Sequence, residues 1–324
     1  MPCASYSEET YRTAICCRFK KLVVADRILA AVSTVVGDPQ TYKGAYILAA
    51  LLFYTIQLYA DFTGGIDITI GIAEVMGITV EENFIRPYFS TSLKEYWRRW
   101  HITMCSWFRD YLFYPVSTSR WMSRFTKFTK ARFGNKAGKR IPVYVSSFIV
   151  WLATGIWHGA SWNFIVWGLL NWAVLMVSEE LEPLYARFHE RFGLKEKAGY
   201  KVFMMLRTFC LICVLNLFDC YQHVGDTLRS LASILTAGNW AILTDGSLNA
   251  IGPSRLDYGI VAAGCLLMLL VSIYQERCGS LREKIHERPL ALRFAIWYGL
   301  FLLVLLLGAY GIGYDASQFI YNQF

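Results

Sequence analysis

Apolar and polar positions along this chain fall into blocks, with long uncharged runs separated by short charged ones. The longest run, residues 143–177, holds 35 residues without Asp, Glu, Lys or Arg. Such a run crosses a bilayer or fills a very large core. One straight helix of this length would measure about 52 Å, against about 30 Å of hydrocarbon. We therefore expect the run to divide between Gly155 and Ser161, where Gly155 and Gly159 have the spacing that allows a close helix contact.

The other apolar runs predict an all-α bundle of about six to eight membrane helices. Clear runs occupy residues 44–60, 202–218, 258–274 and 290–313. Residues 22–36 contain Asp26 and Arg27, so this segment is a poor isolated span and is expected to pack inside the bundle.

Several weaker segments complete this pattern. Residues 66–78 predict a short or re-entrant helix, residues 226–237 a short amphipathic helix, and residues 239–256 a polar or re-entrant segment. Gln57 and Asp61 lie four residues apart and share a helix face. A carboxylate at the end of a span usually lies at the membrane interface, which is the position expected for Asp61.

Residues 92–114 have an amphipathic pattern, in which aromatic and apolar side chains recur at steps of three and four between basic ones. This pattern predicts one helix lying in the membrane interface. His101 falls on the apolar face, four residues after Trp97 and three before Met104, and is expected to point inward. A buried histidine with satisfied hydrogen bonds would explain it equally well.

Charged loops set the predicted orientation. Residues 117–142 contain eight Lys or Arg and no acidic residue, which by the positive-inside tendency predicts a cytoplasmic loop. Residues 179–201 form a charge-balanced loop. The formal net charge of +8 lies mostly between apolar runs, so it indicates topology and not nucleic-acid binding.

Composition supports a polytopic membrane protein. Of the 324 residues, 55% are apolar and 17% are charged, whereas soluble domains carry about 25% charge. Five of the eleven Trp fall between Trp151 and Trp172, too many for one interfacial belt, so some are expected to line an interior surface. The nine Cys lack histidine partners at zinc spacing, and we expect no metal site.

His158 is the one ionisable side chain in the longest uncharged run. It lies ~22 Å of helix from the start of the run, which is membrane depth. A titratable group held there is a functional-site hypothesis. The competing explanation is a helix-contact motif whose histidine is hydrogen-bonded to a neighbouring carbonyl.

The candidate catalytic residues are therefore two inward-facing histidines, His101 and His158. A histidine in a low dielectric is neutral at physiological pH and available as a general base. Such a base suits a neutral, weakly acidic group such as a hydroxyl. Cys105 follows His101 by four residues and is a candidate activated thiol on the same face, although a cysteine in an apolar helix is far more often a packing residue.

Two separated motifs resemble the membrane-bound O-acyltransferase (MBOAT) family, namely SLKEYWRRWHITMCSWFRDYLFYPV and TGIWHGASWNFIVWGL. They are similar in particular to its bacterial branch, which O-acetylates polysaccharides such as alginate. The likeness extends over essentially the whole chain through FKKLVVADRI, QLYADFTGGIDITIGIA, ENFIRPYFSTSL and the closing FIYNQF.

The resemblance implies a polytopic helical bundle with interfacial and re-entrant helices around a tunnel. Residues 1–324 would form one membrane domain, corresponding to the C-terminal portion of the family fold. His158 matches the family's catalytic histidine, and His101 matches a second histidine near the same tunnel. Relatives usually carry further membrane helices before the FKK segment, so we expect a shortened protein or a fragment.

The implied reaction moves an acyl group, expected to be acetyl, from a cytoplasmic thioester to a hydroxyl acceptor. Acetyl-CoA or an acyl-carrier protein would be the co-substrate, and no bound cofactor is expected. The implied setting is the cytoplasmic (inner) membrane, with the lipid bilayer and an extracytoplasmic acetyltransferase as partners. Two other hypotheses stay open: a transporter or export-channel subunit with His158 as a proton relay, and bis-histidine haem ligation by His101 and His158.

Overall fold

The computed structural model describes residues 18–194 and 196–310, and regular structure in this part of the chain is helical apart from one isolated bridge between Phe84 and Trp100. The N-terminal residues and the closing FIYNQF motif lie outside the described residues. The chain divides into two compact units, one formed by the segments before Asn83 and after Thr227, the other by residues 83–227. One membrane domain over residues 1–324 stays a prediction.

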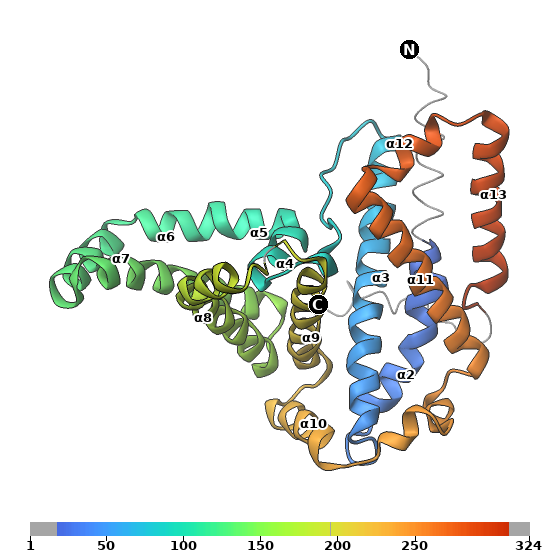
Figure 1. Ribbon diagram of the computed structural model, residues 1–324, viewed down its shortest axis with the longest axis horizontal. Helices are drawn as coiled ribbons and strands as arrows, with labels where there is room; N and C mark the ends of the chain where they lie inside the picture. Colours follow the sequence, from blue (N-terminus) through green and yellow to red (C-terminus); the bar gives the residue numbers. More distant parts are fainter. Residues whose placement is uncertain (1–17, 195, 311–324) are drawn as a thin grey trace. The chain divides into compact units, whose positions relative to one another are not determined.

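The first unit is built around the π-helical segment η1 (Phe19–Ala25) and helix α2 (Asp26–Gly37). Val23, Val24 and Ile28 are completely buried and form a core with residues of three longer helices. These helices are α3 (Ala45–Val75), α11 (Arg255–Cys278) and α13 (Leu290–Leu307). Figure 1 shows α2 beside α3. The prediction that residues 22–36 pack inside a bundle is confirmed.

Helix α3 corrects two predictions. It continues through Gly64 and Gly65 to Val75, so the separate short or re-entrant helix predicted for residues 66–78 is wrong. Both glycines are buried, and close packing around them offsets their poor helix propensity. Asp61 lies in the middle of α3 and is only 2% exposed, so the premise that it ends a helix is wrong. It is held there by Lys21, whose Nζ lies 2.8 Å from Asp61 Oδ1 and 2.8 Å from Asp26 Oδ1.

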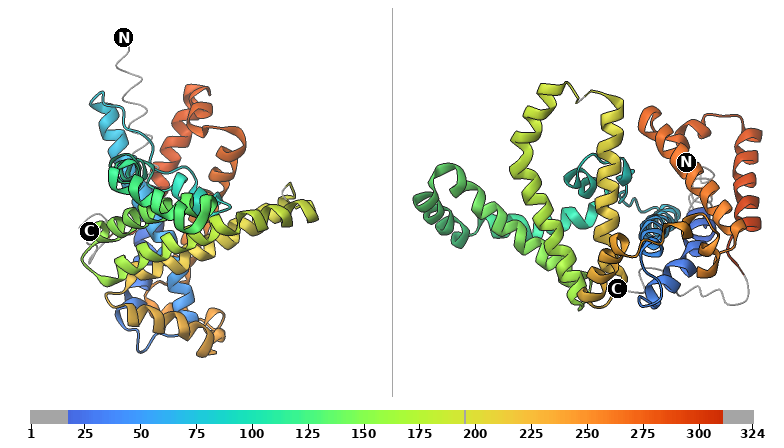
Figure 2. Two further views of the ribbon diagram at one scale, coloured as in Figure 1. Left: turned by 90° about the vertical axis from the view of Figure 1, so that its left-hand side faces the viewer. Right: turned by 60° about the horizontal axis from the view of Figure 1, so that its bottom comes forward.

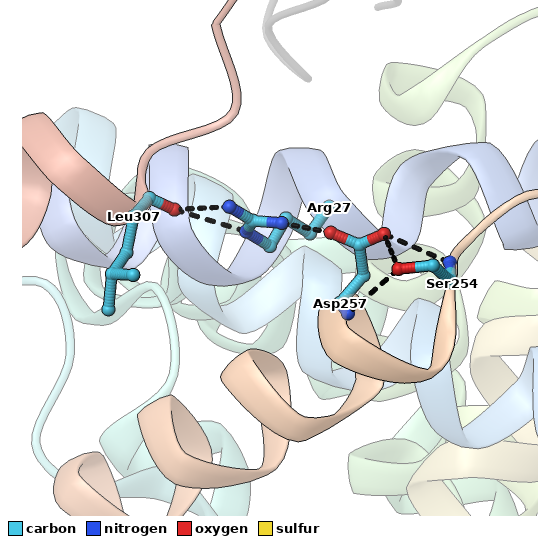
Figure 3. Close-up of polar contacts among 4 residues, drawn as sticks. All are labelled: Arg27, Ser254, Asp257 and Leu307. Atoms are coloured by element: carbon cyan, nitrogen blue, oxygen red, sulfur yellow. Dashed lines mark hydrogen bonds and ion pairs between the residues drawn. The ribbon is translucent and has the colours of Figure 1, made fainter.

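Arg27 joins three elements of the first unit, as Figure 3 shows. Its guanidinium forms an ion pair with Asp257 at the start of α11 and donates from Nε (3.1 Å) and Nη2 (2.6 Å) to the carbonyl oxygen of Leu307, the last residue of α13. Asp257 in turn forms a capping box with Ser254. One half-buried cation therefore satisfies the terminal carbonyl of α13 and pairs with the carboxylate that caps α11.

Replacing Arg27 with Ala should lower the stability of the first unit by about 2 kcal/mol, because Asp257 and the Leu307 carbonyl both lose a charged donor. Thermal unfolding of the purified protein in detergent measures the loss. Arg288→Ala, at an exposed site of the same unit, is the matched control and should leave the melting temperature unchanged. Equal melting temperatures for the two variants would contradict this role of Arg27.

The second unit contains the long helices α7 (Arg120–His158), α8 (Trp162–Phe192) and α9 (Ala198–Cys220). Helix α7 packs against α8, and α8 and α9 form a hairpin with a short connection (Figure 2). The predicted division of residues 143–177 is confirmed, because the chain leaves the helix at Gly159 and re-enters at Trp162. Gly159 adopts φ 155°, a conformation that favours glycine, and Ser161 caps α8 by accepting from the amide of Asn163.

The single amphipathic helix predicted for residues 92–114 is wrong. The segment forms four short elements, and the helix is interrupted at Trp100 and His101. Trp100 is extended and His101 is left-handed with φ 47°. The cause is tertiary: the amide of Ile85 donates to Arg99 O, and that of Ile102 donates to Asn83 O. The four elements are α4 (Leu93–Arg99), α5 (Ile102–Phe108), η3 (Arg109–Phe113) and α6 (Tyr114–Thr118).

The two charged segments are helical and not loops. Residues 117–142 run through α6 into the first part of α7, which bends at Gly134 (φ 78°). Most of residues 179–201 belong to α8 and α9. The predicted helix at residues 226–237 is confirmed as α10 (Val224–Thr236), while residues 239–256 contain the 3₁₀ segments η4 (Trp240–Leu243) and η5 (Ser247–Ile251).

Six helices in the described part of the chain are long and apolar enough to cross a membrane: α3, α7, α8, α9, α11 and α13. Helix α12 (Leu281–His286), which connects α11 to α13, is short. The prediction of an all-α polytopic membrane bundle is confirmed.

Candidate active site

The candidate site lies in the second unit, where α7 ends beside the start of α8. Two glycines bring the helices together. A Cβ placed on Gly155 would lie 2.6 Å from the carbonyl oxygen of Phe164, and one on Gly168 would lie 2.5 Å from that of Trp151. The predicted close helix contact at Gly155 is therefore present, with α8 as the partner. His158 follows one turn after Gly155 and is positioned by this contact.

Aromatic rings surround the His158 imidazole. Its centroid lies 4.7 Å from the ring of Trp167, 4.9 Å from Trp157 and 5.9 Å from Phe164. Trp167 is buried, whereas Trp157 is 54% exposed. The imidazole itself is half-buried, so it combines apolar walls with an open side. The prediction that some of the clustered Trp line an interior surface holds for Trp167.

His101 reaches the same site from the interruption between α4 and α5. Its Nδ1 lies 3.3 Å from Asn83 Oδ1, and the same oxygen accepts from the amide (3.1 Å) and hydroxyl (2.6 Å) of Thr103. Asn83 is buried and thereby fixes the ring. Because Oδ1 is an acceptor, this contact requires a proton on Nδ1 and leaves Nε2 of the neutral ring as its basic nitrogen.

The structure brings the two predicted histidines together. The indole of Trp157 contacts both imidazoles, with centroids 6.3 Å from His101 and 4.9 Å from His158. Two imidazoles against one exposed indole form a compact site.

Three supporting residues were not found from the sequence pattern. Asn83 orients His101, as described. Trp97 contacts Trp167 at 5.7 Å between centroids, and its Nε1 donates to Asn171 Oδ1 at 3.2 Å. Asn171 is fully buried and donates to the carbonyl oxygen of Trp167 at 2.9 Å. The sequence does mark Asn171, because it is a polar residue inside an apolar helix. It does not mark Asn83, because the residue that Asn83 contacts belongs to a separate segment of the chain.

Cys105 does not fit the role of an activated thiol and agrees with the packing alternative. Burial raises the pKa of the Cys105 thiol to about 12, so the group is a protonated thiol at physiological pH. Its Sγ lies 3.6 Å from the carbonyl oxygen of Trp100. Among residues 18–194 and 196–310, no group of three His, Cys, Asp or Glu side chains has the arrangement of a metal site.

Acid should destabilise the folded protein because His101 is buried in its neutral form. Burial lowers the pKa of His101 to about 4 in the folded state, against about 6.5 for an exposed histidine. Between these two values the unfolded chain binds a proton that the native chain does not, so stability falls as the pH falls through this window and is independent of His101 above it. Thermal unfolding over this pH range measures the slope.

His101→Asn removes the titrating group and keeps a residue type that tolerates the left-handed backbone. The variant should therefore show a smaller loss of melting temperature in acid than the wild type. Equal slopes for the two proteins would contradict the burial of a neutral His101.

These observations define a multi-pass helical membrane protein with a histidine pair at a helix junction. A family match covers residues 23–130 and 131–220, and the family is described as MBOAT, membrane-bound O-acyltransferase. The chain belongs to this family.

Curated relatives agree with the branch predicted from the motifs. The chain is 34% identical over 268 residues to a probable alginate O-acetylase AlgI of Pseudomonas aeruginosa, a match covering 80% of this chain and 45% of the relative. It is 29% identical to a peptidoglycan O-acetyltransferase of Helicobacter pylori, covering 78% of this chain and 46% of the relative. A teichoic acid D-alanyltransferase of Bacillus subtilis is 35% identical over only 40% of this chain and 31% of the relative. The chain spans about half the length of the O-acetylating relatives.

Proposed function

We propose that the protein is a membrane-bound O-acyltransferase that moves an acyl group from a thioester to a hydroxyl. The observation that carries this proposal is the half-buried His158 imidazole, which shares the exposed indole of Trp157 with His101. A neutral imidazole among aromatic walls is suited to remove a proton from a weakly acidic hydroxyl. Family membership supports the same reaction class.

In the proposed mechanism a ring nitrogen of His158 accepts the proton of the acceptor hydroxyl. The hydroxyl oxygen forms a bond to the thioester carbonyl carbon, and the carbon–sulfur bond then breaks. The leaving thiolate takes the proton from the His158 imidazolium, so that charge and atoms balance. His101, held by Asn83 through Nδ1, orients the acceptor by accepting a hydrogen bond from it at Nε2.

For the substrates, we propose an acetyl group carried by acetyl-CoA or an acyl-carrier protein on the cytoplasmic side, and a hydroxyl of an exported or cell-surface polysaccharide as acceptor. The names of the relatives support this choice, since they act on alginate, peptidoglycan or teichoic acid. The cytoplasmic membrane is the proposed location, and an extracytoplasmic acetyltransferase is the proposed partner protein.

Acyl turnover in reconstituted vesicles separates this proposal from a transporter that uses His158 as a proton relay. The purified protein is given acetyl-CoA on one side and a soluble oligosaccharide on the other. We expect release of free thiol together with an equal amount of acetyl ester on the oligosaccharide. Movement of substrate or protons across the vesicle membrane without ester formation would reject the acyltransferase and favour the transporter.

A further inference from the structure

The first part of α7 forms a basic hairpin, defined here as residues 120–140. The chain bends at Gly134, and the two arms touch. Thr129 Oγ1 donates to the carbonyl oxygen of Gly138 at 2.8 Å, and a Cβ on Gly138 would lie 2.4 Å from the Cα of Lys130. The hairpin is therefore a defined surface element, and the proposed acyl transfer does not use it.

Its positive charge is exposed and mostly uncompensated. The hairpin holds eight Lys or Arg and no acidic residue. Arg140 forms an ion pair with Glu180 at 2.6 Å, whereas no ion pair to the other seven is found within the described residues. Those seven side chains are all exposed: Arg120, Arg124, Lys127, Lys130, Arg132, Lys136 and Lys139. Such a surface attracts anionic partners.

Aromatic rings lie beside these cations. Trp121 is 57% exposed, Phe128 62% and Phe133 56%. Trp121 and Phe125 stack with ring centroids 5.7 Å apart, and steps of four and three place Trp121, Phe125 and Phe128 on one helix face. Met122 and Thr129 form the adjacent buried face. The exposed part of the helix therefore carries an aromatic stripe next to a basic one.

We propose that the basic hairpin binds the surface of an anionic phospholipid membrane. Lysine and arginine side chains would contact the headgroup phosphates, while the aromatic stripe lies at the boundary between headgroups and acyl chains. The phosphates of a nucleotide would satisfy the cations but would leave these large rings exposed. A membrane surface offers phosphates for the basic stripe and an apolar boundary for the adjacent aromatic stripe along the whole helix, and this match favours lipid.

Trypsin cleavage of the intact protein in lipid nanodiscs tests this proposal, because the exposed Lys and Arg are themselves cleavage sites. Nanodiscs of pure phosphatidylcholine are compared with nanodiscs that also contain phosphatidylglycerol. Exposed Arg187 and Arg191 on α8 serve as the internal reference. We expect cleavage within the hairpin, relative to this reference, to be about tenfold slower with the anionic lipid and to recover at high salt.

A charge-reversed variant with a matched control tests whether the positive charge of the hairpin causes the protection from trypsin. Lys127→Glu with Lys130→Glu should remove most of the protection at the remaining hairpin sites. The same reversal at Arg187 and Arg191 should leave hairpin protection intact, with Lys197 and Lys201 then serving as reference sites. Equal cleavage of the wild-type hairpin in the two lipids would overturn the proposal. So would protection in phosphatidylcholine nanodiscs that appears only on adding acetyl-CoA or an acidic acyl-carrier protein.

Discussion

Replacing His158 with Ala is expected to lower acetylation of the exported polysaccharide by about 10³-fold, because the reaction loses its general base. The protein should still accumulate in the membrane, since the α7–α8 contact depends on Gly155 and Gly168 and not on the imidazole. Ester content of the polysaccharide and abundance of the protein in membrane fractions are the two measurements.

His189→Ala is the matched control for this change. His189 lies on α8, outside the cluster around Trp157. Its Nε2 lies 2.9 Å from the hydroxyl oxygen of Tyr200. The control variant should acetylate like the wild type. Retained acetylation in His158→Ala, or equal losses in both variants, would reject His158 as the base.

Substituting Gly168 with Ala should separate α7 from α8 and lower activity by about 10²-fold without touching a reacting group. The added Cβ would lie 2.5 Å from the carbonyl oxygen of Trp151, and a backbone atom cannot move aside as a flexible side chain does. The displacement would shift the His158 imidazole relative to the Trp167 indole. The centroids of these two rings are 4.7 Å apart. Acyl-transfer rate and thermal stability are measured together.

Gly259→Ala provides the same chemical change in another apolar helix, α11. A Cβ there meets no atom within 4 Å. We expect no loss of activity and no loss of stability from this control. If Gly168→Ala behaved like Gly259→Ala, the close helix contact would not be what positions the imidazole.

The membrane helices were predictable from the sequence because their signal is local. Long uncharged runs and the small residues around Gly159 contain the information for the spans and for the break between α7 and α8. The likeness to the family came from short motifs around His101 and His158, and the family match confirms it. The sequence therefore identifies both histidines as candidates, whereas their arrangement follows from the fold.

The predictions that failed concern residues whose conformation or surroundings depend on contacts with segments distant in the sequence. Residues 83–85 pair with residues 99–102 and interrupt the predicted amphipathic helix, a contact that helical periodicity does not encode. Asp61 lies mid-helix because Lys21, 40 positions earlier, supplies its counter-charge. Asn83 was missed for the same reason, since only the fold places it beside His101.

The most direct test of the account is a structure of the protein with a non-transferable thioether analogue of the acyl donor and a hydroxyl acceptor both bound. A ring nitrogen of His158 is predicted to lie about 2.6–3.2 Å from the acceptor hydroxyl oxygen, with the acyl carbon beside it. An acceptor hydroxyl that contacts neither His158 nor His101, while donor and acceptor are both in place, would contradict the proposed chemistry.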